Sequence, residues 1–189
     1  MARTPSAMID LGQTCPPFRL PDPTGAMHGL DDAAEAKAVL VMFICNHCPF
    51  VKHLADPLAA LVHQWQPEGL ATFAIQSNDI EAHPLDGPSA MAEEAMARGY
   101  QFPYLLDEDQ SVARAFGATC TPDFFLYDGE RRLVYRGQFD ETRPDDGAPH
   151  GADLDTAIEA VLEGRLVPAE QHPSLGCNIK WKPGNEPVG

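Results

Sequence analysis

The chain has 189 residues, of which 44% are hydrophobic, and its 28 acidic residues against 13 lysines and arginines give a formal charge of -15. This length and composition predict one globular domain with a sizeable core and many loops. The negative charge argues against nucleic acid and anionic membrane surfaces as partners. With no apolar run long enough to span a membrane and no secretion signal at the start, we expect a cytoplasmic protein.

The predicted elements alternate between strands and helices. A short strand near residues 18–20 enters a turn rich in proline and glycine, which predicts an amino-terminal hairpin. Unbroken apolar runs predict buried strands, and apolar residues at helical spacing predict helices packed on them. In chain order we expect a strand at 39–44, a helix at 51–65, a strand at 70–76, and helices near 89–98 and 111–116.

The pattern changes after Pro122. Two apolar runs flank Asp128-Gly129, which predicts a hairpin and therefore a mixed sheet, and a last helix ends at Gly164. We therefore expect a domain spanning residues 1–164. The tail, residues 165–189, shows no periodicity but contains enough apolar residues to predict that it docks on the domain.

Two of the five cysteines form the clearest chemical motif, Cys45-Asn46-His47-Cys48, at the junction between a strand and a helix. An odd cysteine count suits a reducing compartment with a redox or metal role. Unpaired amides and the dipole at a helix start favour a thiolate. We expect Cys45 to be the exposed nucleophile and Cys48 the resolving thiol, with no cofactor, and His47 to stabilise the Cys45 thiolate.

A metal-binding function is an alternative for the same residues. Cys45, His47 and Cys48, with His53, could hold copper or zinc, which would make the protein a metal carrier or a redox sensor. A structural zinc site usually has a second Cys or His pair at matching spacing, and the sequence lacks one. We therefore favour redox chemistry and assign no metal.

Thr121-Pro122 is a second landmark, because a Thr-Pro pair at the start of a strand suits a cis peptide. With the CxxC pair and the order of elements, the chain resembles the thioredoxin superfamily, which implies an α/β fold with a central mixed sheet. Leu105-Leu106-Asp107 and the 124–129 segment resemble its alkyl hydroperoxide reductase and thiol-specific antioxidant branch, the peroxiredoxins. The resemblance implies that Thr121 and cis Pro122 support the disulfide and that the Thr121 backbone pairs with an extended substrate.

The chain departs from the peroxidatic pattern of that branch. The pattern has a threonine where this chain has Cys45 and an arginine where it has Pro122, although Cys48-Pro49 matches the peroxidatic Cys-Pro pair. The missing arginine argues against fast peroxide reduction. An antioxidant thiol peroxidase is therefore the second alternative.

Two further thiols lie in informative places. Cys120 stands close to Pro122 in the sequence and Cys177 lies in the tail, so they could form a second disulfide relay. Packing as small buried residues is the interpretation we favour. The sequence thus predicts a thiol–disulfide oxidoreductase acting with protein or small-molecule thiols and disulfides and one further redox partner, and it indicates no particular oligomeric state.

Overall fold

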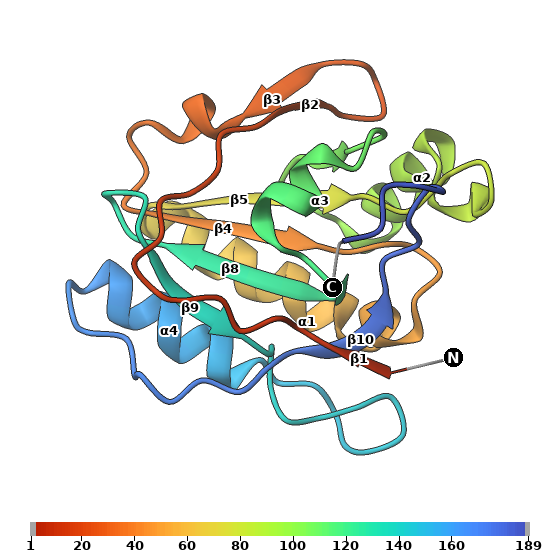
Figure 1. Cartoon of the computed structure of the whole chain (residues 1–189). Helices are drawn as coiled ribbons and strands as arrows, with labels where there is room; N and C mark the ends of the chain where they lie inside the picture. The colour runs from red at the N-terminus through yellow and green to blue at the C-terminus, as the bar shows by residue number, and fades with distance from the viewer. Residues whose placement is uncertain (1–2, 188–189) are drawn as a thin grey trace.

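The central element of the protein is a mixed five-stranded sheet (Figure 1). The computed structural model describes residues 3–187. The strand order is β6-β5-β4-β8-β9, in which β4, β5 and β6 run parallel and β8 and β9 run antiparallel to their neighbours. The strands are β4 (Ala38–Phe43), β5 (Leu70–Gln76), β6 (Tyr104–Leu106), β8 (Asp123–Tyr127) and β9 (Leu133–Gly137). The predicted α/β fold with a mixed sheet is confirmed.

Helices cover both faces of this sheet because its strands are apolar on both sides. Leu40 and Met42 belong to the cluster that packs with α1 (Pro49–Trp65) and α4 (Ala152–Leu162). Val41 and Phe43 alternate with them and pack on the opposite face with α3 (Ser111–Phe116), while α2 (Pro88–Arg98) adds Met91 to the first cluster.

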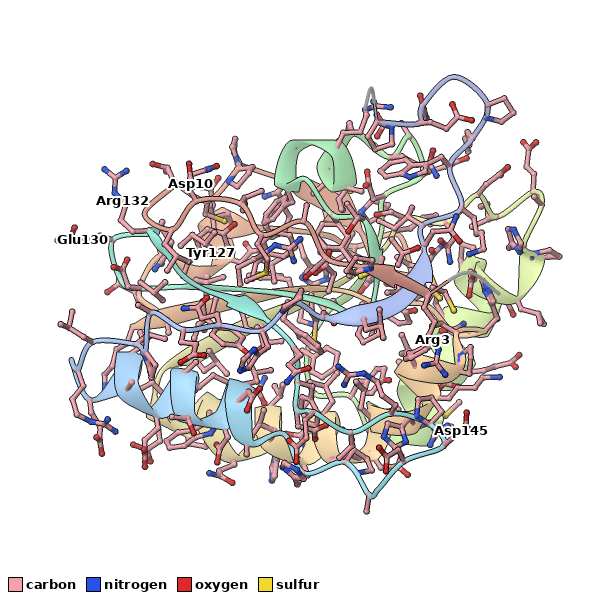
Figure 2. All side chains as sticks on the ribbon, turned by 60° about the horizontal axis from the view of Figure 1, so that its bottom comes forward. Arg3, Asp10, Tyr127, Glu130, Arg132 and Asp145 are labelled. Carbon is pink, nitrogen blue, oxygen red and sulfur yellow. The ribbon has the colours of Figure 1, made fainter. Side chains whose placement is uncertain are left out.

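Two hairpins follow the sequence predictions. The amino-terminal hairpin pairs β2 (Arg19–Pro21) with β3 (Met27–Gly29) in antiparallel register. In the β8–β9 hairpin, Asp128 Oδ1 accepts the backbone N–H of Glu130 and of Arg132, each at 2.9 Å, which closes the turn. Figure 2 shows Tyr127 inside the body, while Glu130 and Arg132 point outward.

A second, three-stranded sheet is absent from the sequence predictions. Its order is β1-β10-β7, with β1 (Arg3–Pro5), β10 (Leu175–Asn178) and β7 (Cys120–Thr121). The tail thus contributes a strand between two segments that are distant in sequence. Among residues 3–187, no helix is long and apolar enough to cross a membrane.

Candidate active site

The two cysteines of the CxxC motif lie together at the start of α1. Cys45 follows β4, and Cys48 is the N-cap residue of α1, directly before Pro49. Thr121 contacts both thiols: its Oγ1 lies 3.4 Å from Cys45 Sγ, and its carbonyl oxygen lies 3.2 Å from Cys48 Sγ. The Thr121–Pro122 peptide bond is cis. The structure therefore brings four of the sequence-predicted site residues together.

Both thiols are buried, with exposed fractions of 1% for Cys45 and 0% for Cys48. The prediction of an exposed Cys45 is therefore wrong for this structure. The tail strand β10 contributes to this burial, because its Cys177 pairs with Thr121 and belongs to the same buried cluster as both thiols. The backbone edge that the family resemblance assigns to an extended substrate is occupied by the chain itself, which corrects that expectation.

The negative charge of the reduced pair is favoured on Cys48. Its pKa is lowered because Cys45 donates a hydrogen bond to its sulfur, with further donors from Cys177, the Val51 backbone and Thr121, and these outweigh burial. The pKa of Cys45 is raised because its proton is held by Cys48, because it is buried, and because Asp86 is negatively charged. The more acidic thiol of the pair in this structure is therefore Cys48.

Asp86 holds the loop between the two cysteines, a role that was not predicted from the sequence. Asp86 ends the short 3-10 helix η3 (Pro84–Asp86) and is fully buried. Its Oδ1 accepts the backbone N–H groups of Asn46 at 2.9 Å and His47 at 3.2 Å, and its Oδ2 accepts Asn78 Nδ2 at 2.9 Å. A buried carboxylate with this many donors is satisfied and fixes the conformation of the CxxC loop.

His47 is directed toward that carboxylate. Its Nδ1 lies 2.5 Å from Asp86 Oδ2, and its ring stacks on His83 with centroids 5.1 Å apart. Ligand atoms of Cys45, His47 and Asp86 lie within 4.8 Å of one another, so these three could hold a metal ion. That set differs from the predicted one, because Asp86 replaces Cys48, and His53 instead contacts the Thr142 hydroxyl at 3.0 Å.

The remaining thiols differ in their relation to the pair. Burial, followed by the influence of the neighbouring Cys48, raises the pKa of Cys177 to about 12. Cys120 is fully buried, and its Sγ lies 3.6 Å from the Pro122 carbonyl oxygen. Cys15 is buried in the cluster on the α3 face, and burial raises its pKa to about 12.

The reduced protein is expected to lose a thiol proton at a lower pH than an ordinary cysteine does. Because the pKa of Cys48 is lowered, the stabilisation by its thiolate is present above the ordinary pKa and is lost as pH falls through the folded value. Ultraviolet thiolate absorbance during a pH titration measures this step. The absorbance step at low pH should vanish in the Cys48→Ala variant and persist in the Cys15→Ala variant. A step that survives in Cys48→Ala would contradict the assignment.

The fold and the site together define the class of protein. A mixed sheet with a CxxC pair at the start of α1 and a cis proline segment against it is the arrangement of a thioredoxin-fold redoxin, a class of oxidoreductase enzymes. The chain belongs to the AhpC/TSA family, whose model matches residues 11–136, more than half of the chain. The predicted membership of the peroxiredoxin-like branch of the thioredoxin superfamily is thereby confirmed.

Individual relatives agree with this assignment. The crystal structure of a hypothetical protein from Sinorhizobium meliloti 1021 is 50% identical, covers 96% of this chain and 100% of its own, and has a TM-score of 0.94. A Coxiella burnetii protein described as a peroxiredoxin, bcp, is 24% identical over 131 residues, which are 67% of this chain and 80% of that protein. The thioredoxin domain of a thiol-disulfide oxidoreductase from Bacteroides vulgatus shares the fold, with 17% identity and a TM-score of 0.61 over 79% of this chain and 99% of its own.

Proposed function

We propose that the protein exchanges a dithiol for a disulfide through Cys45 and Cys48, with Thr121 and Pro122 positioning the pair. The observation that carries the proposal is that both thiols lie at a helix start against one residue, Thr121, whose Oγ1 is 3.4 Å from Cys45 Sγ and whose carbonyl oxygen is 3.2 Å from Cys48 Sγ. Two thiols held against the same residue can form a disulfide without a large rearrangement. We also propose that the chain consists of a domain of residues 1–164 and a tail of residues 165–189 that docks on it.

The pKa values suggest the order of the exchange. The Cys48 thiolate attacks a sulfur of the substrate disulfide, a mixed disulfide forms on Cys48, and the other substrate sulfur leaves as a thiolate. Cys45 then loses the hydrogen bond and the negative charge of Cys48, two of the causes that raise its pKa. The Cys45 thiolate attacks Cys48 and releases the substrate. Ligand atoms of Cys45, His47 and Asp86 lie within 4.8 Å of one another, so the Asp86–His47 couple is placed to take up the Cys45 proton through one water.

Glutathione titration tests this function. The wild-type protein is expected to show a reversible two-electron transition at roughly -270 to -120 mV, followed by mass after blocking free thiols. Cys45→Ser should retain substrate as a mixed disulfide on Cys48, whereas Cys15→Ser should behave like wild type. Retention on Cys45 in Cys48→Ser, with none on Cys48 in Cys45→Ser, would reverse the proposed order. Absence of any transition would end the disulfide-exchange proposal.

A thiol peroxidase remains a second candidate because Cys48, with its lowered pKa, directly precedes Pro49 at the helix start. The Cys45 and Pro122 positions lack the threonine and arginine of the peroxidatic pattern. Stopped-flow oxidation by hydrogen peroxide distinguishes the two functions. Oxidation of the reduced pair no faster than that of an ordinary thiol would reject the peroxidase.

The partners we propose are protein or small-molecule thiols and disulfides, together with a redox partner that regenerates the pair. The odd number of cysteines supports a reducing compartment, and we place the protein in the cytoplasm on that ground.

A further inference from the structure

The strand β10 lies directly on the active-site segment. Cys177 pairs with Thr121 and Asn178 with Cys120, in antiparallel register. Gly176 allows this close approach, since a Cβ there would lie 2.0 Å from the Thr121 carbonyl oxygen. On its other edge β10 pairs with β1, whose Arg3 lies 5.9 Å from the centroid of the Phe50 ring on α1 (Figure 2).

Hydrogen bonds fix β10 at both ends. Before it, Ser174 Oγ donates to the Pro122 carbonyl oxygen at 2.7 Å. After it, the backbone N–H of Ile179 donates to the Thr119 carbonyl oxygen at 3.2 Å, and that of Lys180 donates to Asn78 Oδ1 at 2.8 Å. The tail is therefore held in place on both sides of Cys177. Specific hydrogen bonds, and not loose packing, fix the position of the Cys177 thiol.

Cys177 brings a third thiol to the pair. It lies opposite Thr121, which contacts both Cys45 and Cys48, and the three cysteines belong to one buried cluster. Cys177 is 2% exposed, which separates this group of three sulfurs from solvent. The chain itself thus adds an extended segment to the Thr121 edge, with Cys177 opposite Thr121.

We propose that Cys177 is a third redox thiol, which moves the active-site disulfide from Cys45–Cys48 to Cys48–Cys177. This proposal rests on the proposed function, because it needs a Cys45–Cys48 disulfide to begin. The Cys177 thiolate attacks Cys48, the Cys48–Cys177 bond forms, and the Cys45–Cys48 bond breaks. Cys45 leaves as a thiolate and receives the proton that Cys177 lost. One disulfide is exchanged for another, so no oxidant or reductant is consumed.

Two features favour this exchange over reaction with an external thiol. The attacking and attacked sulfurs belong to one chain and to one buried cluster, and both residues lie against Thr121, which makes the effective concentration of Cys177 high. Oxidation of the pair also removes the Cys48 thiolate, one of the causes that raise the pKa of Cys177. The exchange therefore becomes easier once the Cys45–Cys48 disulfide has formed.

Disulfide mapping tests the proposal. The reduced protein is oxidised with glutathione disulfide, excess reagent is removed, and samples are acid-quenched over time, alkylated, digested and mapped by mass spectrometry. In the wild type we expect the Cys45–Cys48 peptide to fall while the Cys48–Cys177 peptide rises, with the total number of disulfides constant. Cys177→Ser should retain Cys45–Cys48 alone, and Cys15→Ser, which removes a buried thiol outside the site, should match the wild type.

Gly176→Ala tests the role of the strand with all three thiols present. The alanine methyl group conflicts with the Thr121 backbone, so β10 shifts, and the exchange should slow by about tenfold or more because small displacements of reacting atoms cost intramolecular reactions heavily. Circular dichroism shows whether the variant is folded. If Gly176→Ala is unfolded, a second variant, Cys45→Ser, replaces it in the test. After oxidation with diamide, Cys45→Ser is expected to form a Cys48–Cys177 disulfide.

The outcomes separate this proposal from the proposed function. A wild-type protein that forms Cys45–Cys48 and never Cys48–Cys177 overturns the role of Cys177 and leaves the proposed function intact. A protein that forms no Cys45–Cys48 disulfide overturns both. An exchange rate in folded Gly176→Ala equal to that of the wild type overturns the role of the docked strand.

Discussion

Replacing Asp86 with alanine is expected to lower the free energy of unfolding by about 3 to 5 kcal/mol. The carboxylate is fully buried, and its loss leaves the backbone N–H groups of Asn46 and His47 and the Asn78 side-chain amide without an acceptor. Those groups hold the CxxC loop, so disulfide exchange should slow as well. Urea unfolding of the reduced protein and the rate of exchange with glutathione measure the two effects.

The conservative change Asp86→Asn separates geometry from charge. The asparagine Oδ1 can still accept the backbone N–H groups of Asn46 and His47. The stability of Asp86→Asn should therefore lie between that of Asp86→Ala and that of the wild type. The negative charge that raises the pKa of Cys45 is removed, so that pKa should fall. Asp145→Ala, at an exposed aspartate (Figure 2), is the control and should change stability by less than about 0.5 kcal/mol. An Asp86→Ala variant as stable as this control would refute the role of the carboxylate.

The strands and helices of the main sheet were predictable from sequence because their signal is local. The apolar run before Cys45 is a buried strand, Ala38–Phe43, and the helical spacing after it is α1. The junction of the two places the CxxC pair at a helix start. Local patterns thus suffice for both the fold class and the position of the cysteines.

The features that the sequence did not reveal depend on contacts between distant residues. Asp86 ends a 3-10 helix of three residues, too short to show a periodic pattern, and its partner His47 is 39 residues away. β1 and β10 have three and four residues, too few for a periodic pattern, and they pair across most of the chain. The lowered pKa of Cys48 follows from this pairing in part, because Cys177 reaches Cys48 only when β10 is docked.

Asp123→Ala is expected to destabilise the protein by about 3 to 5 kcal/mol, because it leaves the Arg136 guanidinium buried without a counterion. Both side chains are fully buried and form two hydrogen bonds, and Arg136 Cζ lies 3.8 Å from the centroid of the Phe125 ring. Asp123 Oδ2 also accepts the Thr119 backbone N–H at 3.2 Å, so the same change loosens the segment that carries Thr121 and Pro122. Disulfide exchange should therefore slow along with the loss of stability.

The complementary change Arg136→Met leaves the buried Asp123 carboxylate without its counterion. Burial already raises the pKa of Asp123. The folded variant then holds a proton that the unfolded chain releases, so its stability should decrease as pH rises through the folded pKa. The double variant Asp123→Leu/Arg136→Met removes both charges and should be less destabilised than either Asp123→Leu or Arg136→Met alone. Asp56→Ala breaks a surface pair with Arg98 and is the control, with an expected effect of at most about 1 kcal/mol. Urea unfolding measures the loss of stability in each variant. If the loss in the double variant equals the sum of the losses in the two single variants, Asp123 and Arg136 are not coupled, because coupling predicts that the second substitution relieves the cost of the first.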